Sequence, residues 1–432
     1  MPERLNCENV RPAGVAGRSR GGRPGAPIVG CPGVCGRPLP VVTYVIEKAT
    51  QECAVEENPM TSSPAPAARN RYIDTLRAAA IVRVVIYHAF GWAWLTILLP
   101  AMGVMFAVAG SLMAASIEAH GVRRAVTSRV RRLLPALWVF GAVAVPIMLW
   151  HGWPADDPDH PYSAWKLVFW IVPISDPPGS HWGTPLWEVL WYVRAYLLFV
   201  FASPVLYFLY RRLSWLVVAA PLAGLLALVL TGFRLPDPMD GMMWDFVTYC
   251  ACWVAGFAHR DGRLARLPRG VHATAVIALA GAGGYWLCTH PTADGFDINE
   301  VPIARTLWSL AFVLLVLRFR PAMTTVEQTP WLSSTVTFIN ARAVTIYLWH
   351  YPVITVGAAL LVRLAVPWDT PEYVFFMMAV TTAFIVVAVL LFGWVEDVSA
   401  RRRPALWPVR SRSRPARAPD LVPQAPAEAW QT

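Results

Sequence analysis

The chain carries little charge for its length. Only 15% of its 432 residues are charged and 56% are hydrophobic, whereas a soluble globular domain has about 25% charged residues. This scarcity excludes an ordinary soluble domain. Several apolar runs approach the ~20 residues that a membrane-spanning helix needs. The 21 tryptophans agree with this interpretation, because Trp collects at membrane interfaces.

Metal-binding and common catalytic motifs are also missing. Neither Cys31/Cys35 nor Cys250/Cys252 has His or Cys partners nearby at zinc spacing, so we expect no metal site. No nucleophile elbow, P-loop, HExxH or dinucleotide fingerprint occurs in a usable context, and we expect no bound cofactor. The net charge of +10 is compatible with nucleic-acid binding. However, the arginines lie between apolar runs and in the two tails, so we interpret them as topology determinants and expect no nucleic acid.

The composition divides the chain into three regions. Residues 1–67 are rich in Arg, Gly, Pro and Ala and lack sustained periodicity, which predicts a disordered extension. This extension has no apolar core of signal-peptide type. We hypothesise that translation starts at Met60, which mass spectrometry of the native N-terminus would test. Residues 68–397 form the predicted membrane domain, and residues 398–432 form a basic disordered tail suited to contact with anionic lipid.

Ten apolar runs in the central region predict an all-α, multi-pass membrane protein. The ten expected spans are 73–94, 97–117, 133–152, 185–208, 213–232, 242–258, 271–289, 302–319, 339–363 and 372–395. A further apolar segment at 163–174 is too short to span comfortably, and we expect an interfacial or re-entrant piece.

The loop charges alternate in sign along the chain. Arginine clusters occur at 118–132, 211–212, 260–269, 318–320 and 401–403. Acidic residues occupy the intervening loops at 156–159, 237–240, 294–300 and 369–372. By the positive-inside rule, both termini are expected in the cytoplasm, and the acidic loops outside. The largest external loop, 151–184, is long enough to cover an outward-facing site.

The first predicted span contains ionisable groups that hydrocarbon should not hold. Arg77 and His88 are eleven residues apart, which at about 100° per residue places them on one helix face, about 16 Å apart along the axis. If Arg77 lies at the cytoplasmic surface, His88 lies past the middle of a core about 30 Å thick. A cation at the mouth and an imidazole inside suggest a path into the bilayer.

Each of these groups also has a structural interpretation. A neutral His88 could simply bond a neighbouring helix, but an ionisable residue within a span is by default a functional candidate, and an imidazole can accept and return a proton. Arg77 either snorkels, pairs with Asp74, or recognises an anion. Arg83 lies about 120° away from the shared face and must meet an acid or a hydrated cavity.

Two other stretches concentrate polar and aromatic residues. LWEVLWYVRAYL contains Glu188 and Arg194; Glu188 lies near the outer surface, where an interfacial charge is the simpler explanation. IYLWHYP places His350 just before Pro352, and proline kinks a helix and frees backbone carbonyls. An aromatic packing contact is at least as good an explanation of His350 as a substrate contact.

The segment RYIDTLRAAAIVRVVIYHAFG resembles the opening of the acyltransferase 3 family of integral membrane acyltransferases, whose signature is Arg, ten residues, His. GVMFAVAGSLM, SRVRRLLPALW, PLWEVLWYVRAYLL and AVTIYLWHYPV are similar to four later family motifs, in order, so the resemblance covers about residues 72–395. The chain departs from the pattern at Arg83, where the family is usually apolar, at Glu188, where an aromatic is usual, and at Ala343, where Ser is common.

The resemblance implies transfer of an acyl group, often acetyl, from cytoplasmic acyl-CoA to a hydroxyl of a sugar, glycolipid or polysaccharide. It makes His88 the general base and Arg77 a second catalytic candidate. Candidate residues for binding acyl-CoA or the acceptor are Arg129, Arg131, Arg132, Trp187, Tyr196, Tyr347 and His350. The expected location is the cell membrane, and the expected partners are acyl-CoA, the acceptor and membrane lipids.

Two other functions fit the same residues. One is a transporter or flippase of a carbohydrate or lipid intermediate, in which His88 relays protons and no acyl-CoA is consumed. The other is acylation of a small molecule such as a macrolide.

Overall fold

The computed structural model describes residues 71–406 except 294, 320, 322 and 369. The predicted extension over 1–67, the proposed start at Met60 and most of the C-terminal tail lie outside the described residues. Within them the chain forms helices and loops, with one isolated β-bridge between Thr292 and Gly295. The fold is therefore all-α, as the apolar runs predict.

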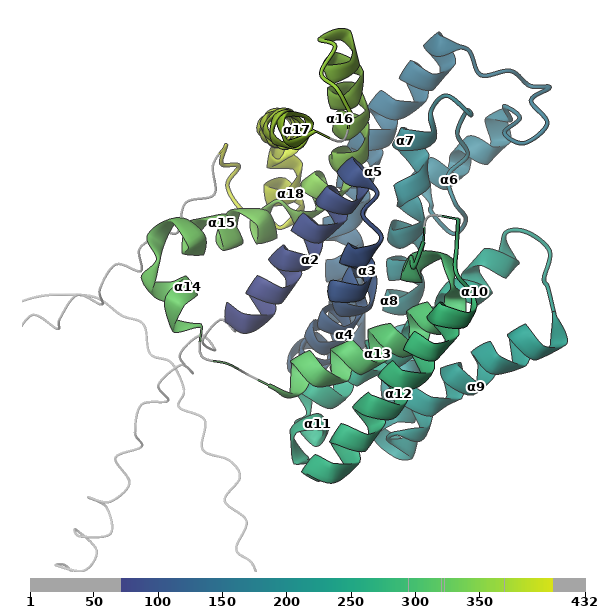
Figure 1. Ribbon diagram of the computed structural model, residues 1–432, viewed down its shortest axis with the longest axis vertical. Coiled ribbons are helices and arrows are strands. Elements are labelled where there is room, and N and C mark those ends of the chain that lie inside the picture. Colours follow the sequence, from purple (N-terminus) through teal and green to yellow (C-terminus); the bar gives the residue numbers. More distant parts are fainter. Residues whose placement is uncertain (1–70, 294, 320, 322, 369, 407–432) are drawn as a thin grey trace, which may run out of the picture. The chain divides into compact units, whose positions relative to one another are not determined.

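Each of the ten predicted spans overlaps one or more helices (Figure 1). The long helices are α2 (Arg71–Phe90), α4 (Ala101–His120), α5 (Val122–His151), α8 (Trp191–Leu213), α9 (Leu216–Thr231), α10 (Met239–Arg260), α12 (Arg269–Thr289), α13 (Pro302–Arg318), α15 (Pro330–Ala341), α16 (Ala343–Arg363) and α17 (Pro371–Phe392). The short ones are α3 (Trp94–Leu98), η1 (Ala164–Leu167), α6 (Val168–Ile171), α7 (Thr184–Trp187), η2 (Glu188–Leu190), α11 (Arg263–Arg266), η3 (Ile298–Glu300), α14 (Thr324–Gln328) and α18 (Trp394–Ser399).

Six described segments are long and apolar enough to cross a membrane. They are Trp94–His120, Val122–His151, Thr184–Leu213, Arg269–Thr289, Ala343–Arg363 and Pro371–Phe392. The other predicted spans correspond to α2, α9, α10 and α13. Of these, α9 and α13 are only 16 and 17 residues long. The chain is therefore a multi-pass membrane protein. The number of spans, ten, and the location of both termini in the cytoplasm remain predictions.

Two helix boundaries differ from the sequence-based expectation. The basic stretch before the third predicted span is helical rather than a loop, because α5 begins at Val122 and arginine is a good helix former. The ninth predicted span, 339–363, begins in a separate helix. The backbone at Arg342 is not helical (φ −117°, ψ 23°), so α15 ends there and α16 starts anew.

Close approach of two helices builds the centre of the bundle. α10 packs against α4, α8, α9 and α13 (Figure 1), and it is buried from Val247 to His259. A Cβ added to Gly110 would lie 2.2 Å from the carbonyl oxygen of Trp253, and one added to Gly256 would lie 2.1 Å from that of Ala107. The glycines therefore permit a backbone contact that any side chain would block, as is common between membrane helices.

α2 lies against α4, α15 and α16 (Figure 1). Arg71 begins α2, at the end of the helix that is predicted to face the cytoplasm. Its side chain is buried and donates to Ser333 and Thr337 of α15. The short apolar segment at 164–171 packs on α5, where Trp170 lies beside Phe140 and the indole of Trp138 donates to the carbonyl of Ile171. Its two helices of four residues each are too short to span, as expected.

Candidate functional site

A cavity of about 840 Å³ opens beside the first half of α2. Four arginines from three separate parts of the chain line it: Arg77, Arg129, Arg132 and Arg402. Glu396 is the one carboxylate among the lining residues. Four guanidinium groups against one carboxylate give this space a positive potential, which attracts anions. We call it the arginine cavity.

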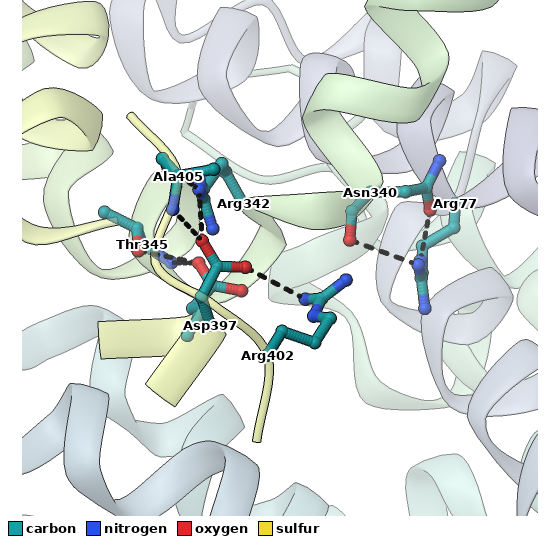
Figure 2. Close-up of polar contacts among 8 residues, drawn as sticks. Arg77, Asn340, Arg342, Thr345, Asp397, Arg402 and Ala405 are labelled. Atoms are coloured by element: carbon teal, nitrogen blue, oxygen red, sulfur yellow. Dashed lines mark hydrogen bonds and ion pairs between the residues drawn. The ribbon is translucent and has the colours of Figure 1, made fainter. Parts of the chain in front are cut away.

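Arg77 is fixed in this cavity by α15. Its Nε donates to Oδ1 of Asn340 at 2.5 Å, and its Nη2 reaches the Asn340 carbonyl at 3.4 Å (Figure 2). The amide nitrogen of Asn340 in turn donates to the carbonyl of Asp74. The side chain of Asn340 thereby bridges α15 and α2, and it orients the guanidinium that the sequence identified.

Helix geometry separates the three candidate arginines of α5. Arg129 and Arg132 are three residues apart and share a helix face, and both line the arginine cavity. Arg129 also donates to the carbonyl of Leu112 on α4 at 2.9 Å. Arg131 lies off that face and donates instead to the carbonyl of Ser399 in α18 at 3.2 Å. The structure therefore brings two of the three candidates to the cavity.

The C-terminal segment supplies a wall that sequence reasoning missed. Arg342 is fully buried and its Nη2 donates to Oδ2 of Asp397 at 2.7 Å, while Arg402 approaches the other oxygen at 3.4 Å (Figure 2). Asp397 also accepts from the backbone N–H of Ala405. One carboxylate thus ties the chain after α18 to the α15–α16 junction and holds Arg402 at the cavity.

Glu396, the neighbour of Asp397, is also buried. It accepts hydrogen bonds from the backbone N–H and the hydroxyl of Thr345, at 2.8 and 2.6 Å. Burial raises the pKa of this carboxyl, and the bonds from Thr345 oppose that rise. A charged Arg342 and an acidic pair just before the basic tail were visible in the sequence. Their separation by more than 50 positions hid the contact.

His88 lines a second, smaller cavity of about 200 Å³ beside the second half of α2. We call it the histidine cavity. Aromatic rings surround the imidazole: the centroid of Tyr351 lies 4.9 Å away, that of His350 lies 5.0 Å away and that of Tyr87 lies 5.5 Å away. His350 itself is fully buried and its Nδ1 donates to the carbonyl of Tyr347. The two predicted intramembrane histidines are therefore neighbours.

Tyr347 lines both cavities. Its hydroxyl donates to the carbonyl of Val189 at 2.7 Å, and its ring lies 5.0 Å from that of Tyr192, another residue of the arginine cavity. Tyr196, one turn along α8 from Tyr192, lines the arginine cavity as well. Tyr347 is therefore the residue that the linings of the two cavities share.

Arg83 lies at a cavity, one of the two alternatives that the sequence left open, and Tyr87 stands between it and the acid Asp297. It is buried, it lines the histidine cavity, and its guanidinium lies 4.8 Å from the centre of the Tyr87 ring. The Tyr87 hydroxyl donates to Oδ2 of Asp297. The carboxylate of Asp297 therefore offsets the Arg83 charge through Tyr87.

Trp187 and Glu188 lie away from both cavities. The indole of Trp187 donates to the carbonyl of Ser180 at 3.0 Å and its ring packs against His160, so it anchors the loop between α5 and α8. Glu188 is exposed, in agreement with an interfacial charge. Nearby, Arg194 is paired with Asp176 at 2.8 Å and with Asp245. Burial raises the pKa of Asp176, and the Arg194 charge opposes that rise.

Among the described residues, no three His, Cys, Asp or Glu side chains gather as metal ligands. One cavity is a positively charged anion site, and the other places an imidazole among aromatic rings and two arginines, with Tyr347 common to both linings.

Comparison with known protein families assigns the chain to one of them. The family model of the acyltransferase 3 family, described as an acyltransferase domain, matches residues 70–390. Searches of curated proteins and of solved structures gave no match. The match covers all the helices from α2 to α16 and most of α17. The chain is a membrane acyltransferase of the acyltransferase 3 family.

Proposed function

We propose that the protein is an O-acyltransferase that moves an acyl group, most simply acetyl, from cytoplasmic acyl-CoA to a hydroxyl of a sugar, glycolipid or polysaccharide outside the cytoplasm. The single observation that carries the proposal is Tyr347, which lines both the arginine cavity and the histidine cavity. An anion site and a base on adjoining cavities suit a donor that is anionic at one end and reactive at the other.

The arginine cavity suits the nucleotide end of CoA. Its volume of about 840 Å³ falls within the ~300–1,000 Å³ of ordinary ligand sites. Arginine forks bind phosphate oxygens with two parallel hydrogen bonds, and Arg77, Arg129, Arg132 and Arg402 offer four such forks to the phosphates of CoA. In this proposal Tyr192 and Tyr196 flank the thin pantetheine arm on its way to Tyr347.

The histidine cavity suits the transfer step. His88 takes the proton of the acceptor hydroxyl, and the acceptor oxygen forms a bond to the thioester carbonyl carbon. The resulting tetrahedral oxyanion collapses, the carbon–sulfur bond breaks, and the CoA sulfur takes the proton back from the imidazolium. Tyr87, Trp191 and Tyr249 line this cavity, and aromatic rings with polar edges suit the mixed C–H and O–H surface of a sugar.

The test is a transfer assay on sealed membrane vesicles that contain the protein. We expect radiolabel from [¹⁴C]acetyl-CoA supplied on the cytoplasmic side to appear in an alkali-labile ester of a lipid-linked or polymeric saccharide. A matched reaction with [¹⁴C]acetate and CoA should give none, because acetate lacks the activated thioester. Movement of a saccharide across the membrane without any consumption of acetyl-CoA would contradict the proposal in favour of a transporter.

A further inference from the structure

Two guanidinium groups in the histidine cavity have buried donors without an acceptor. Nη2 of Arg83 and Nε of Arg305 are both inaccessible to solvent, and neither has a hydrogen-bond partner among the described residues. Both residues line the cavity that contains His88. An unsatisfied buried donor costs about 1–3 kcal/mol or more if charged, so a pair of them marks a place where an acceptor oxygen is expected.

Backbone carbonyls hold both groups in place. Nε of Arg83 donates to the carbonyl of Leu95 in α3 at 3.3 Å. Nη1 of Arg305 donates to the carbonyl of Asn299 at 2.9 Å. Each arginine thus uses part of its fork on the protein and leaves another N–H free. Fixed donors stabilise charge that develops during a reaction better than mobile ones, because they need no reorganisation.

The size of the cavity places these donors near the reacting atoms. Its volume of about 200 Å³ corresponds to roughly seven waters at about 30 Å³ each. An oxygen that reaches His88 inside this space is therefore never far from Arg83 and Arg305. No carboxylate lines the cavity among the described residues, so the two cations face the ligand rather than an acid there.

We propose that Arg83, together with Arg305, donates to the oxyanion of the tetrahedral intermediate, as the electrophilic partner of His88. This inference rests on the proposed acyl transfer. As the acceptor oxygen attacks, the carbonyl π electrons move onto the carbonyl oxygen, and the free N–H groups of Arg83 and Arg305 bond that oxygen. When the carbon–sulfur bond breaks, the carbonyl re-forms and both donors are released. Asp297 acts as a positioning residue, because it restrains Tyr87 under the Arg83 guanidinium.

The experiment compares purified wild type with Arg83→Met, Arg83→Lys and Arg305→Lys in acetyl-CoA hydrolysis, with CoA release followed by a thiol reagent. We expect kcat to fall about 10²–10³-fold in Arg83→Met, the range measured when an oxyanion donor is lost, while KM for acetyl-CoA stays within about threefold. Arg83→Lys retains the charge but not the fork, so its kcat should fall less. Arg194→Lys is the matched control: Arg194 is a buried arginine that lies outside both cavities, and its kcat should stay within about twofold of wild type.

A binding measurement keeps the inference testable if Arg83→Met fails to fold. A trifluoromethyl-ketone analogue of acetyl-CoA hydrates to a tetrahedral form, and we expect Arg83→Lys to weaken its binding at least tenfold while binding of CoA itself is unchanged. Equal kcat in wild type and all variants would overturn the inference. A raised KM with unchanged kcat would also overturn it, because that result indicates that the arginines bind the ground state of a ligand. Absence of CoA release from wild type, with water or membrane lipid extract as acceptor, would overturn the proposed function first and this inference with it.

Discussion

Arg77 and Asn340 are joined across 263 positions of sequence by two hydrogen bonds, from Nε to the side-chain oxygen at 2.5 Å and from Nη2 to the main-chain carbonyl at 3.4 Å (Figure 2). The contact fixes the direction in which the Arg77 fork faces the arginine cavity. Asn340 is therefore a positioning residue for the expected anion site.

Replacement of Asn340 by Ala should raise KM for acetyl-CoA about tenfold with a smaller change in kcat. The reason is that a hydrogen bond to a charged group contributes about 1.5–3 kcal/mol, and its loss lets the Arg77 fork turn away from the ligand. Steady-state kinetics of purified protein measures this. Thr335→Ala, an exposed position on the same helix, is the control and should behave as wild type. An unchanged KM in Asn340→Ala would mean that Arg77 does not bind the donor.

The α5 arginines give a matched set. Arg129→Ala and Arg132→Ala should each raise KM for acetyl-CoA by about tenfold, because each removes a phosphate partner from the arginine cavity. Arg131→Ala should leave KM unchanged, since Arg131 bonds Ser399 instead.

The same variants should not differ from wild type with S-acetylpantetheine, which lacks the nucleotide phosphates. If Arg131→Ala raises KM for acetyl-CoA as much as the other two do, the distinction between cavity and non-cavity arginines is wrong. If KM for S-acetylpantetheine rises in Arg129→Ala and Arg132→Ala as much as KM for acetyl-CoA does, these arginines act on something other than phosphate.

Asp397→Asn should destabilise the protein strongly. The side chain of Arg342 is fully buried, and removal of the partner of a buried charge costs about 3–5 kcal/mol. Thermal unfolding in detergent followed by intrinsic fluorescence measures this as a lower Tm. Arg402→Ala is the control: Arg402 is 56% exposed and lies 3.4 Å from Asp397, so the stability cost should stay below about 1 kcal/mol, while KM for acetyl-CoA rises. Equal Tm in Asp397→Asn and wild type would contradict the role of this ion pair.

The same carboxylate sets a pH dependence. Burial disfavours the ionised form of Asp397, but bonds from Arg342 and the Ala405 N–H outweigh it and hold the pKa below its ordinary value. A lowered folded-state pKa gives stability that is present above the unfolded pKa of about 3.9 and is lost as pH falls through the folded value. The Tm gap between wild type and Asp397→Asn should therefore be constant above about pH 5 and narrow below about pH 4. A gap that instead widens on acidification would assign the effect to another group.

Sequence periodicity predicted helices throughout the membrane domain, including the six segments that are long and apolar enough to cross a membrane, because apolar runs are local signals that do not depend on tertiary contacts. It also placed Arg77 and His88 on one helix, and it predicted that Arg83 needs a polar partner or a hydrated cavity. It missed the break at Arg342, whose side chain is buried against Asp397, far along the chain. It likewise missed Asn340, Arg402 and Arg305. Packing between distant helices brings these polar and charged side chains to a cavity, and the residues next to them in the sequence do not indicate that contact.

Helix geometry explains the mixed outcome for the candidate site residues. Arg77, Arg129, Arg132, Tyr196 and Tyr347 converge on one cavity, while His88 and Tyr347 share the second. His350 contacts His88 from outside the cavity lining. Arg131 and Trp187 lie elsewhere, because a motif groups residues by sequence whereas a helix distributes successive residues around its circumference.

His88 is the centre of the account, and one comparison tests it most directly: CoA release from radiolabelled acetyl-CoA by purified wild type and by His88→Ala, with matched elution and Tm to show an intact fold. General-base catalysis contributes about 10²–10⁴-fold, so we expect release in the variant to fall by at least a hundredfold while binding of CoA is retained. Equal release by the two proteins would remove His88 from the chemistry and contradict the mechanism proposed here.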